Sequence, residues 1–476
     1  MTEQRPVVVS EQWPHVVVVG AGIAGLAAAH ALTVHGRVRV TVLEGSPRAG
    51  GKLLRGQIAG VDTDFGAEAV LARRPEGVDL IARLGLSPSY PQTTKAAIWT
   101  RGRLRSLPAR QVMGVPVDLR GLAACGVVSP VGVARAALDV GLPATKLGED
   151  TSVAAYVGAR LGREVVDRLV EPLLGGVYAG RVDELSLRAT LPQIAAVAEN
   201  SRSLLRALRA VRRPTASGPV FAGLAGGVGR LAEVLTVAIA AAGGSVVFNA
   251  AVRELERLPA GWRLVAGSTV APIAFDADAV VLALPATPAS RLLAANAPAA
   301  AADLGAIEYA SMAVVTLAFS ASAFAQNPLR GSGFLVPTVD GRFIKAATFS
   351  TRKWGWYAEA GRDLVLVRCS VGRHGDTADL QRSDDELIAG SVRDLAAATG
   401  VQGIPRDAVV TRWGGGLPQY AVGHLDRVAR IKAAVATLPG VELCGAAFDG
   451  VGIPACIGSG IGAATQTLDR LFRGGE

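Results

Sequence analysis

Cysteine and histidine are scarce in this 476-residue chain, and their shortage excludes several kinds of site. The 4 cysteines and 5 histidines form no CxxC pair and no cluster, which argues against a zinc site, an iron–sulfur cluster or a disulfide framework. We therefore expect no metal. Lysine is also scarce, since 43 of the 49 basic residues are arginine, and no basic run interleaved with aromatic residues suggests nucleic-acid binding. The excess over 40 acidic residues fits an anionic small molecule or a membrane surface better.

Disorder and secretion are not indicated either. A hydrophobic content of 50% and a mean hydropathy of +0.35 exclude a largely disordered chain. The first 15 residues lack a charged region leading into an apolar core, so they do not resemble a signal peptide, and we expect a cytoplasmic protein. Residues 16–34 are apolar enough for a membrane span by hydropathy alone, but four valines followed by spaced glycines favour a buried strand and a turn.

That stretch carries the pattern of a dinucleotide-binding turn. Residues 16–19 predict a parallel strand, and Gly20, Gly22 and Gly25 follow it with the GxGxxG spacing that opens a helix. These glycines allow a tight turn, a close backbone approach to a pyrophosphate and close packing of the helix on the sheet. Residues 39–43 predict the second strand. Glu44 follows it, 19 residues after Gly25, where an acidic side chain binds ribose hydroxyls.

Further motifs resemble those of the FAD-dependent protoporphyrinogen and coproporphyrinogen oxidase family, the bacterial coproporphyrin type in particular, with amine oxidases and phytoene desaturases as relatives. They span the whole chain: Arg48 to Lys52, Asp64 to Glu68, Gly226 to Leu231, Ala251 to Arg253, Trp413 to Tyr420, and Leu443 to Gly460. The last of these again predicts a strand, a glycine turn and a helix, whose apolar face is Ile461, Ala464, Leu468 and Leu471.

The resemblance implies an α/β fold of the amine-oxidase-like flavoprotein architecture, with a Rossmann-type FAD-binding domain assembled from three segments. We expect that domain at 1–74, 217–295 and 408–476, a mixed α+β substrate-binding domain at 75–105 and 296–407, and a helical insert at 106–216. The expected cofactor is non-covalent FAD, because Cys444 lies within a strand and fits the core. The residues expected to bind it are Gly20, Ala21, Gly22, Ile23, Ala24, Gly25, Glu44, Gly45, Arg48, Gly51, Lys52, Gly66, Ala67, Glu68, Ala69, Val252, Trp413, Gly445, Val451, Gly452 and Ile453.

The chemistry implied is oxygen-linked oxidation of coproporphyrinogen III to coproporphyrin III in haem biosynthesis. A colourless tetrapyrrole is aromatised in repeated two-electron steps, and only one complete nucleotide fingerprint is visible, which favours an oxidase over a reductase. No histidine pair or triad supplies a base, so we expect catalysis mainly by orientation of the macrocycle. Lys345, in a strand predicted over residues 343–349, is the candidate catalytic residue, by analogy with the flavin-facing lysine of amine oxidases.

The substrate that the resemblance implies carries propionates, which cations would bind, and a flat ring, for which small residues would leave room. Arg73 and Arg74 are the first candidates for its propionates, because a guanidinium pairs a carboxylate with two hydrogen bonds. Gly333 and Leu335 resemble the segment that lies against the macrocycle in relatives, where a glycine leaves room for a flat ring. Protoporphyrinogen IX, with two propionates, remains the alternative to coproporphyrinogen III, with four.

Other functions and partners stay open at this point. An amine oxidase or a carotenoid desaturase would share the fold, and a non-enzymatic flavin-binding structural partner would keep the nucleotide without turnover. Residues 112–137 are mostly apolar, so the helical insert offers either peripheral contact with the inner face of the membrane or ordinary core packing. The expected partners are thus a porphyrinogen and molecular oxygen, and also the membrane surface if the helical insert contacts it; no nucleic acid is expected.

Overall fold

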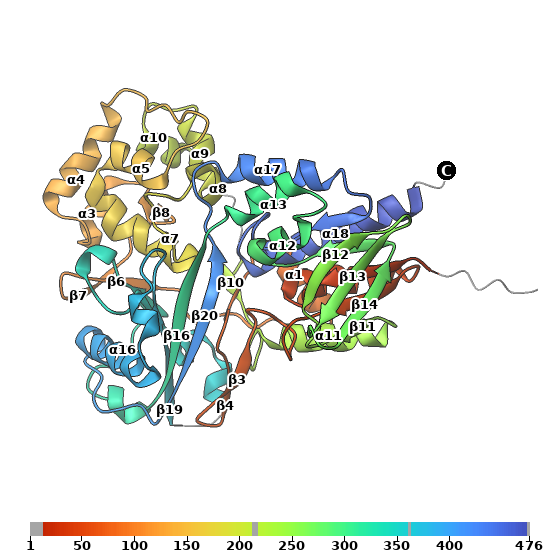
Figure 1. Cartoon of the computed structure of the whole chain (residues 1–476). Helices are drawn as coiled ribbons and strands as arrows, with labels where there is room; N and C mark the ends of the chain where they lie inside the picture. Colours follow the sequence, from red (N-terminus) through yellow and green to blue (C-terminus); the bar gives the residue numbers. More distant parts are fainter. Residues whose placement is uncertain (1–12, 212–217, 360–362, 474–476) are drawn as a thin grey trace, which may run out of the picture.

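A parallel five-stranded sheet forms the nucleotide layer of the molecule, at the right of Figure 1. The computed structural model describes residues 13–211, 218–359 and 363–473. The strand order is β11-β2-β1-β15-β21, and the bounds are β1 His15–Val19, β2 Arg39–Leu43, β11 Ser245–Val247, β15 Ala279–Leu282 and β21 Val441–Leu443. The four valines of β1 are fully or almost fully buried, as a central parallel strand requires.

Alternate side chains of β1 enter different cores, because a strand has a period of two. Val16 and Val18 pack in the core beneath α1 (Ile23–His35), α11 (Arg230–Ala241) and α18 (Ile453–Arg473). Val17 and Val19 pack in a second core on the opposite face. The elements that build this second core are the antiparallel sheet β12 (Val252–Arg257), β13 (Trp262–Gly267) and β14 (Pro272–Ala277), with α12 (Ala286–Leu293), α13 (Pro298–Gly305) and α17 (His424–Val435).

A mixed seven-stranded sheet, at the lower left of Figure 1, forms the second layer. Its order is β20-β16-β19-β18-β17-β6-β7, with bounds β6 Ala96–Thr100, β7 Arg103–Ser106, β16 Tyr309–Ser320, β17 Gly333–Leu335, β18 Ala346–Phe349, β19 Leu364–Val371 and β20 Asp407–Pro418. α16 (Asp384–Thr399) covers one face of this sheet, and it begins at a capping box of Ser383 and Glu386. Two hairpin strands, β3 (Arg55–Ile58) and β4 (Val61–Asp64), lie beside it.

Helices fill residues 119–210, at the upper left of Figure 1. The helical segment over residues 153–178 is interrupted: Gly162, at φ +90°, ends the first part, and a turn of π-helix at Val166–Val170 precedes the last. The last part also continues past Gly175 and Gly176 to Tyr178. The main helices are α3 (Leu119–Cys125), α4 (Pro130–Ala137), α5 (Val153–Leu161), α7 (Glu171–Tyr178), α8 (Leu187–Thr190), α9 (Pro192–Ala198) and α10 (Leu204–Ala210).

The packing departs from the predicted boundaries in two places. α2 (Pro75–Arg83) buries Leu80 and Ile81 in the nucleotide core, and β20 pairs with β16 in the seven-stranded sheet. Each segment packs with a layer other than the one predicted for it. Its distance in sequence from a flavin motif therefore does not tell to which layer it belongs. Residues 1–12, which bear on the signal-peptide expectation, lie outside the described residues. Among the described helices, none combines the length and apolar character that crossing a bilayer requires.

Candidate functional site

The turn between β1 and α1 has the geometry that its glycines predict. Gly20 adopts φ +102° and donates its N–H to the carbonyl of Leu43 at 2.8 Å. A Cβ at Gly25 would lie 1.9 Å from the carbonyl oxygen of Gly20, so no larger residue fits there. These two positions bring the helix close to the sheet and aim its first turn at the carboxyl edge of the strands.

The N-terminus of α1 is open at this edge. Gly22 is the N-cap and provides no side chain to cap the helix, and the first turn contains no acidic residue. A Cβ at Gly22 would meet no atom within 4 Å. Ala21 is buried below the turn, while Ile23 is partly exposed. The unpaired N–H groups and the positive end of the helix therefore form a cradle suited to a phosphate.

Glu44 lies beside this cradle, at the end of β2. Its carboxylate accepts hydrogen bonds from the N–H of Ala21 at 2.7 Å and of Ser46 at 2.8 Å. Gly45 packs against Ala251, because a Cβ there would lie 3.2 Å from the Ala251 Cβ, and Val252 begins β12 directly after Ala251. Glu44 and Val252, both predicted to bind the cofactor, thus lie close together.

The next predicted segment folds over the same turn. Gly50 pairs with Gly22 in an isolated bridge, and a Cβ at Gly51 would lie 3.3 Å from the Gly22 Cα. The Arg48 guanidinium donates to the carbonyls of Ala49, Leu53 and Gly51, so it holds the loop together. The Lys52 side chain is exposed.

Residues 66–69 join this loop to the seven-stranded sheet. Gly66 lies between the Lys52 carbonyl and the Trp413 ring, since a Cβ at this glycine would come 2.0 Å from the carbonyl oxygen and 3.1 Å from the ring. Ala67 donates its N–H to the same Lys52 carbonyl at 3.0 Å, and Ala69 packs near β3 and β4. Trp413 of β20 therefore flanks the loop at residues 66–69, and both are predicted to bind the cofactor.

Glu68 anchors that loop in the protein interior. Its carboxylate accepts hydrogen bonds from Arg368 of β19 at 2.8 Å, from the Trp354 indole at 2.6 Å and from Ser350 at 3.1 Å. Burial alone would raise the pKa of Glu68, but the charges of Lys353 and Arg368 and these hydrogen bonds hold it below its usual value. Glu68 is therefore an ionised carboxylate whose partners fix the loop.

The C-terminal motif, residues 443–460, packs against α1. Gly445 follows β21 at φ +122°, and its N–H donates to the Ser459 hydroxyl at 2.9 Å. Gly460 of α18 lies against α1, so closely that a Cβ on it would come 2.1 Å from the Ala24 carbonyl oxygen. The turn before α18 leaves Gly452 exposed and Ile453 buried, while Val451 packs against the helical core. A second helix N-terminus thus opens at the same edge of the sheet.

The predicted substrate residues do not form one cluster. Arg73 is exposed, and Arg74 pairs with Glu76 at 2.6 Å in a groove beside α17 and α18. Gly333 adopts φ +143°, and a Cβ there would lie 2.1 Å from the Ala347 carbonyl. This glycine is therefore required by the neighbouring strand, whatever room it leaves for a ligand. Leu335 follows it and packs against the helical core.

Lys345 precedes β18 instead of lying within it. Its N–H donates to the Ser370 carbonyl and its own carbonyl accepts from Val336, so the backbone is held between two strands. The side chain is 5% exposed, and the charged groups that act on it are those of Arg373 and Glu171.

Two residues that position the site were not identified as site residues from the sequence. Arg368 interrupts the apolar strand β19, which was the available signal for a buried partner of Glu68. Asp64 accepts hydrogen bonds from the N–H groups of Val228 and Gly229 at 2.7 and 2.8 Å, before α11. Burial raises the pKa of Asp64 to about 6, against the effect of these bonds. The glycine motif at 226–231 thus holds the hairpin that leads into the 66–69 loop.

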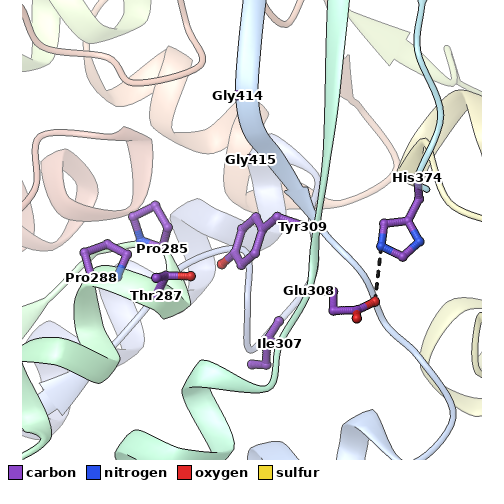
Figure 2. Close-up of a pocket in the computed structure, with 9 residues that line it drawn as sticks. All are labelled: Pro285, Thr287, Pro288, Ile307, Glu308, Tyr309, His374, Gly414 and Gly415. Atoms are coloured by element: carbon purple, nitrogen blue, oxygen red, sulfur yellow. Dashed lines mark ion pairs between the residues drawn. The ribbon is translucent and has the colours of Figure 1, made fainter. Parts of the chain in front are cut away.

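A pocket of about 590 Å³ opens between the start of α12 and the strands β16 and β20 (Figure 2). Figure 2 shows the Tyr309 ring between Pro285, which follows β15, and Glu308, which pairs with His374 at 3.2 Å. Gly414 and Gly415, directly after Trp413, line the same pocket. The pocket therefore reaches the strand that carries the Trp413 ring.

The residues predicted to bind the cofactor lie in neighbouring segments near the N-termini of α1 and α18. The unfilled space at Gly22, the carboxylate of Glu44 and the exposed Lys52 fit a dinucleotide whose pyrophosphate lies on α1. Among the described residues, no group of three or more His, Cys, Asp or Glu side chains is placed to hold a metal ion.

Comparisons with known proteins point the same way. Residues 23–468 match the model of the flavin containing amine oxidoreductases. The chain is 40% identical to the coproporphyrinogen III oxidase of Mycobacterium leprae over 95% of its own length and 97% of that protein. It is 33% identical to the coproporphyrinogen III oxidase of Bacillus subtilis, over 96% and 98%. A solved structure from Exiguobacterium sp. 255-15, provisionally assigned as a protoporphyrinogen oxidase, matches with a TM-score of 0.83 and 31% identity over 95% of this chain and 98% of that one.

Proposed function

This chain belongs to the flavin containing amine oxidoreductase family, and we propose that it oxidises coproporphyrinogen III to coproporphyrin III, with FAD as cofactor and molecular oxygen as acceptor. The observation that carries the proposal is the continuous set of contacts from Gly22 through Gly51 and Gly66 to Trp413. The identity of 33–40% to coproporphyrinogen III oxidases over nearly the full chain supports the choice of substrate.

The cofactor residues that we propose divide by the part of FAD that each group suits. The α1 turn suits the pyrophosphate, Glu44 the ribose, Val252 the adenine, and the 66–69 loop with Trp413 the isoalloxazine. Bound FAD supplies an acceptor for two electrons in each oxidation. The protein orients the macrocycle and keeps the loop rigid through Glu68 and Arg368.

Oxygen as the acceptor is supported by the sequence, in which a single complete nucleotide fingerprint is visible. Peripheral contact with an anionic membrane surface is supported by the outer edge of the helical insert. Val131 and Leu138 are 79% and 57% exposed there, beside a pocket lined by Arg101 and Arg105. We accordingly propose a cytoplasmic protein that contacts the inner face of the membrane.

The test is aerobic incubation of the FAD-loaded protein with coproporphyrinogen III and, separately, protoporphyrinogen IX, while porphyrin fluorescence is followed. Faster turnover of coproporphyrinogen III, with formation of hydrogen peroxide, supports the proposal. The second candidate, protoporphyrinogen oxidation, is favoured by the provisional assignment of the Exiguobacterium structure, and a preference for the two-propionate substrate would establish it instead.

A further inference from the structure

Lys345 carries a buried charge for which the described residues offer no hydrogen-bond acceptor. Its side chain is 5% exposed, and Nζ contacts no acceptor in the part of the chain that the structure describes. A buried ammonium without a partner is costly, because it loses its hydration and gains nothing in return. Burial, and the charge of Arg373, lower the pKa of Lys345 to about 7, while Glu171 opposes them. Such a group requires an explanation.

A second cation lies next to it. Arg373 follows β19 and donates from Nη2 to the Val336 carbonyl at 3.2 Å, while its Nε lies 3.9 Å from Oε1 of Glu171. The Glu171 carboxylate is itself occupied, since it accepts from the Thr338 hydroxyl at 2.5 Å and from the Thr338 N–H at 3.2 Å. One carboxylate therefore faces two cations.

Other acidic groups near the cluster do not supply the missing charge. Asp340 pairs with Arg168 at 3.0 Å, and Asp376 is exposed in the turn after Arg373. When Lys345, Arg373 and Glu171 are all ionised, the three groups retain one net positive charge in a half-buried to buried setting. An incoming anion would neutralise that charge and accept hydrogen bonds from Nζ.

The cluster surrounds the segment that leaves the predicted substrate strand. The Val336 N–H donates a hydrogen bond to the Lys345 carbonyl, and the Val336 carbonyl accepts one from the Arg373 guanidinium. Leu335 directly precedes Val336. Glu171 begins α7, the helix that lies over Leu335: a Cβ at Gly176 would come 3.4 Å from the Leu335 Cδ2. Leu335 is itself only half-buried beside these groups, so a macrocycle lying against Leu335 would bring one of its edges towards the two cations.

We propose that Lys345 and Arg373 form a carboxylate-binding site that receives a propionate of the substrate and makes the enzyme favour four-propionate over two-propionate porphyrinogens. The inference rests on the proposed porphyrinogen oxidase function. No electron or proton transfer to substrate is assigned to Lys345. It acts by charge and by hydrogen bonds to the carboxylate, a charge-assisted contact that strengthens in a site without water.

The test compares Lys345→Met with wild type on both porphyrinogens, using FAD-loaded protein. We expect kcat/KM for coproporphyrinogen III to fall at least about tenfold, and that for protoporphyrinogen IX to change less than about threefold. Lys95→Met, which removes an exposed lysine, is the matched control and should leave both values unchanged. Because Lys345→Met removes an unpaired buried charge, its unfolding midpoint should equal or exceed that of wild type.

A second readout does not depend on turnover. Titration with the product coproporphyrin III, followed by quenching of porphyrin fluorescence, should show at least about tenfold weaker binding to Lys345→Met. An equal loss for both porphyrinogens, or none for either, would overturn the carboxylate site while leaving the oxidase function intact. Failure of wild type to oxidise either porphyrinogen would instead overturn the proposed function, and the inference with it.

Discussion

Arg368 of β19 donates to the Glu68 carboxylate at 2.8 Å across 300 positions of sequence, and both side chains are less than 10% exposed. This ion pair attaches the loop at residues 66–69 to the seven-stranded sheet. The loop also contacts Lys52 and Trp413, so the pair helps to join the nucleotide layer to the seven-stranded sheet.

Glu68→Gln should destabilise the protein by about 3–5 kcal/mol, because it leaves the buried Arg368 charge without its partner. Retained FAD should fall with it. Urea unfolding and the flavin content of the purified protein measure the two effects. Glu76→Gln, which breaks the more exposed pair with Arg74, is the control and should cost less than about 1 kcal/mol. Equal losses in the two variants would contradict the role of Glu68.

We expect Gly22→Ala to weaken FAD binding and Gly25→Ala to destabilise the apoprotein. At Gly22 a Cβ meets open space, so the apoprotein should keep its stability within about 0.5 kcal/mol while FAD binding weakens, since the pyrophosphate needs that space. At Gly25 a Cβ strikes the Gly20 carbonyl, so the apoprotein itself should lose about 1–3 kcal/mol.

Thermal unfolding of apoprotein and fluorescence titration with FAD separate these two effects. Gly462→Ala is the control, because a Cβ there also meets open space, but within α18 away from the proposed pyrophosphate. Normal FAD binding by Gly22→Ala would show that the α1 turn does not hold the pyrophosphate.

His424 should make the fold sensitive to acid. It is fully buried and stacks on Tyr420 with ring centroids 4.0 Å apart, and burial, with the Arg427 charge, lowers its pKa to about 4. The unfolded chain binds a proton at this side chain near pH 6.5, so stability is present above that pH and is lost as the pH falls towards 4. The expected loss between pH 7 and pH 5 is about 2 kcal/mol.

Urea unfolding of wild type and His424→Phe at these two pH values measures this contribution. The pKa values of His15 and His30 are also lowered, so the difference between the two proteins, and not the wild-type slope alone, reports on His424. Identical slopes in wild type and His424→Phe would refute the assignment.

Membrane contact should depend on the outer edge of α4. Val131→Asp places a charge on a side chain that is 79% exposed, so it should reduce sedimentation with vesicles of anionic phospholipid without affecting the fold. Val270→Asp alters a valine that is 93% exposed on the β13–β14 turn and serves as the control. If wild type fails to sediment with vesicles even at low salt, the protein does not bind this surface.

The nucleotide layer could be predicted from the sequence because its signals are local. Its signals are four consecutive valines, three spaced glycines and an acidic residue at the end of the next strand, and each one reports on the conformation of its own short segment. The structure has β1, α1 and β2 where these signals predict them. The helix after Ile453 was predictable for the same reason.

The contacts that complete the site were harder to predict from the sequence, because they join segments that are far apart in the chain. A glycine-rich loop does not reveal that Arg48 turns inward to its own carbonyls, nor that Glu68 meets a strand 300 positions later. Gly333 is constrained by the carbonyl of a neighbouring strand, which its own segment does not show. The breaks around Gly162 and the π-turn likewise depend on packing within the helical layer.

The central claim, that this fold holds FAD so that a porphyrinogen reduces it, is tested most directly by anaerobic mixing of the FAD-loaded protein with coproporphyrinogen III. We expect the yellow flavin absorbance to bleach while porphyrin fluorescence rises, and the colour to return when air is admitted. A flavin that stays oxidised in the presence of excess coproporphyrinogen III would contradict the account.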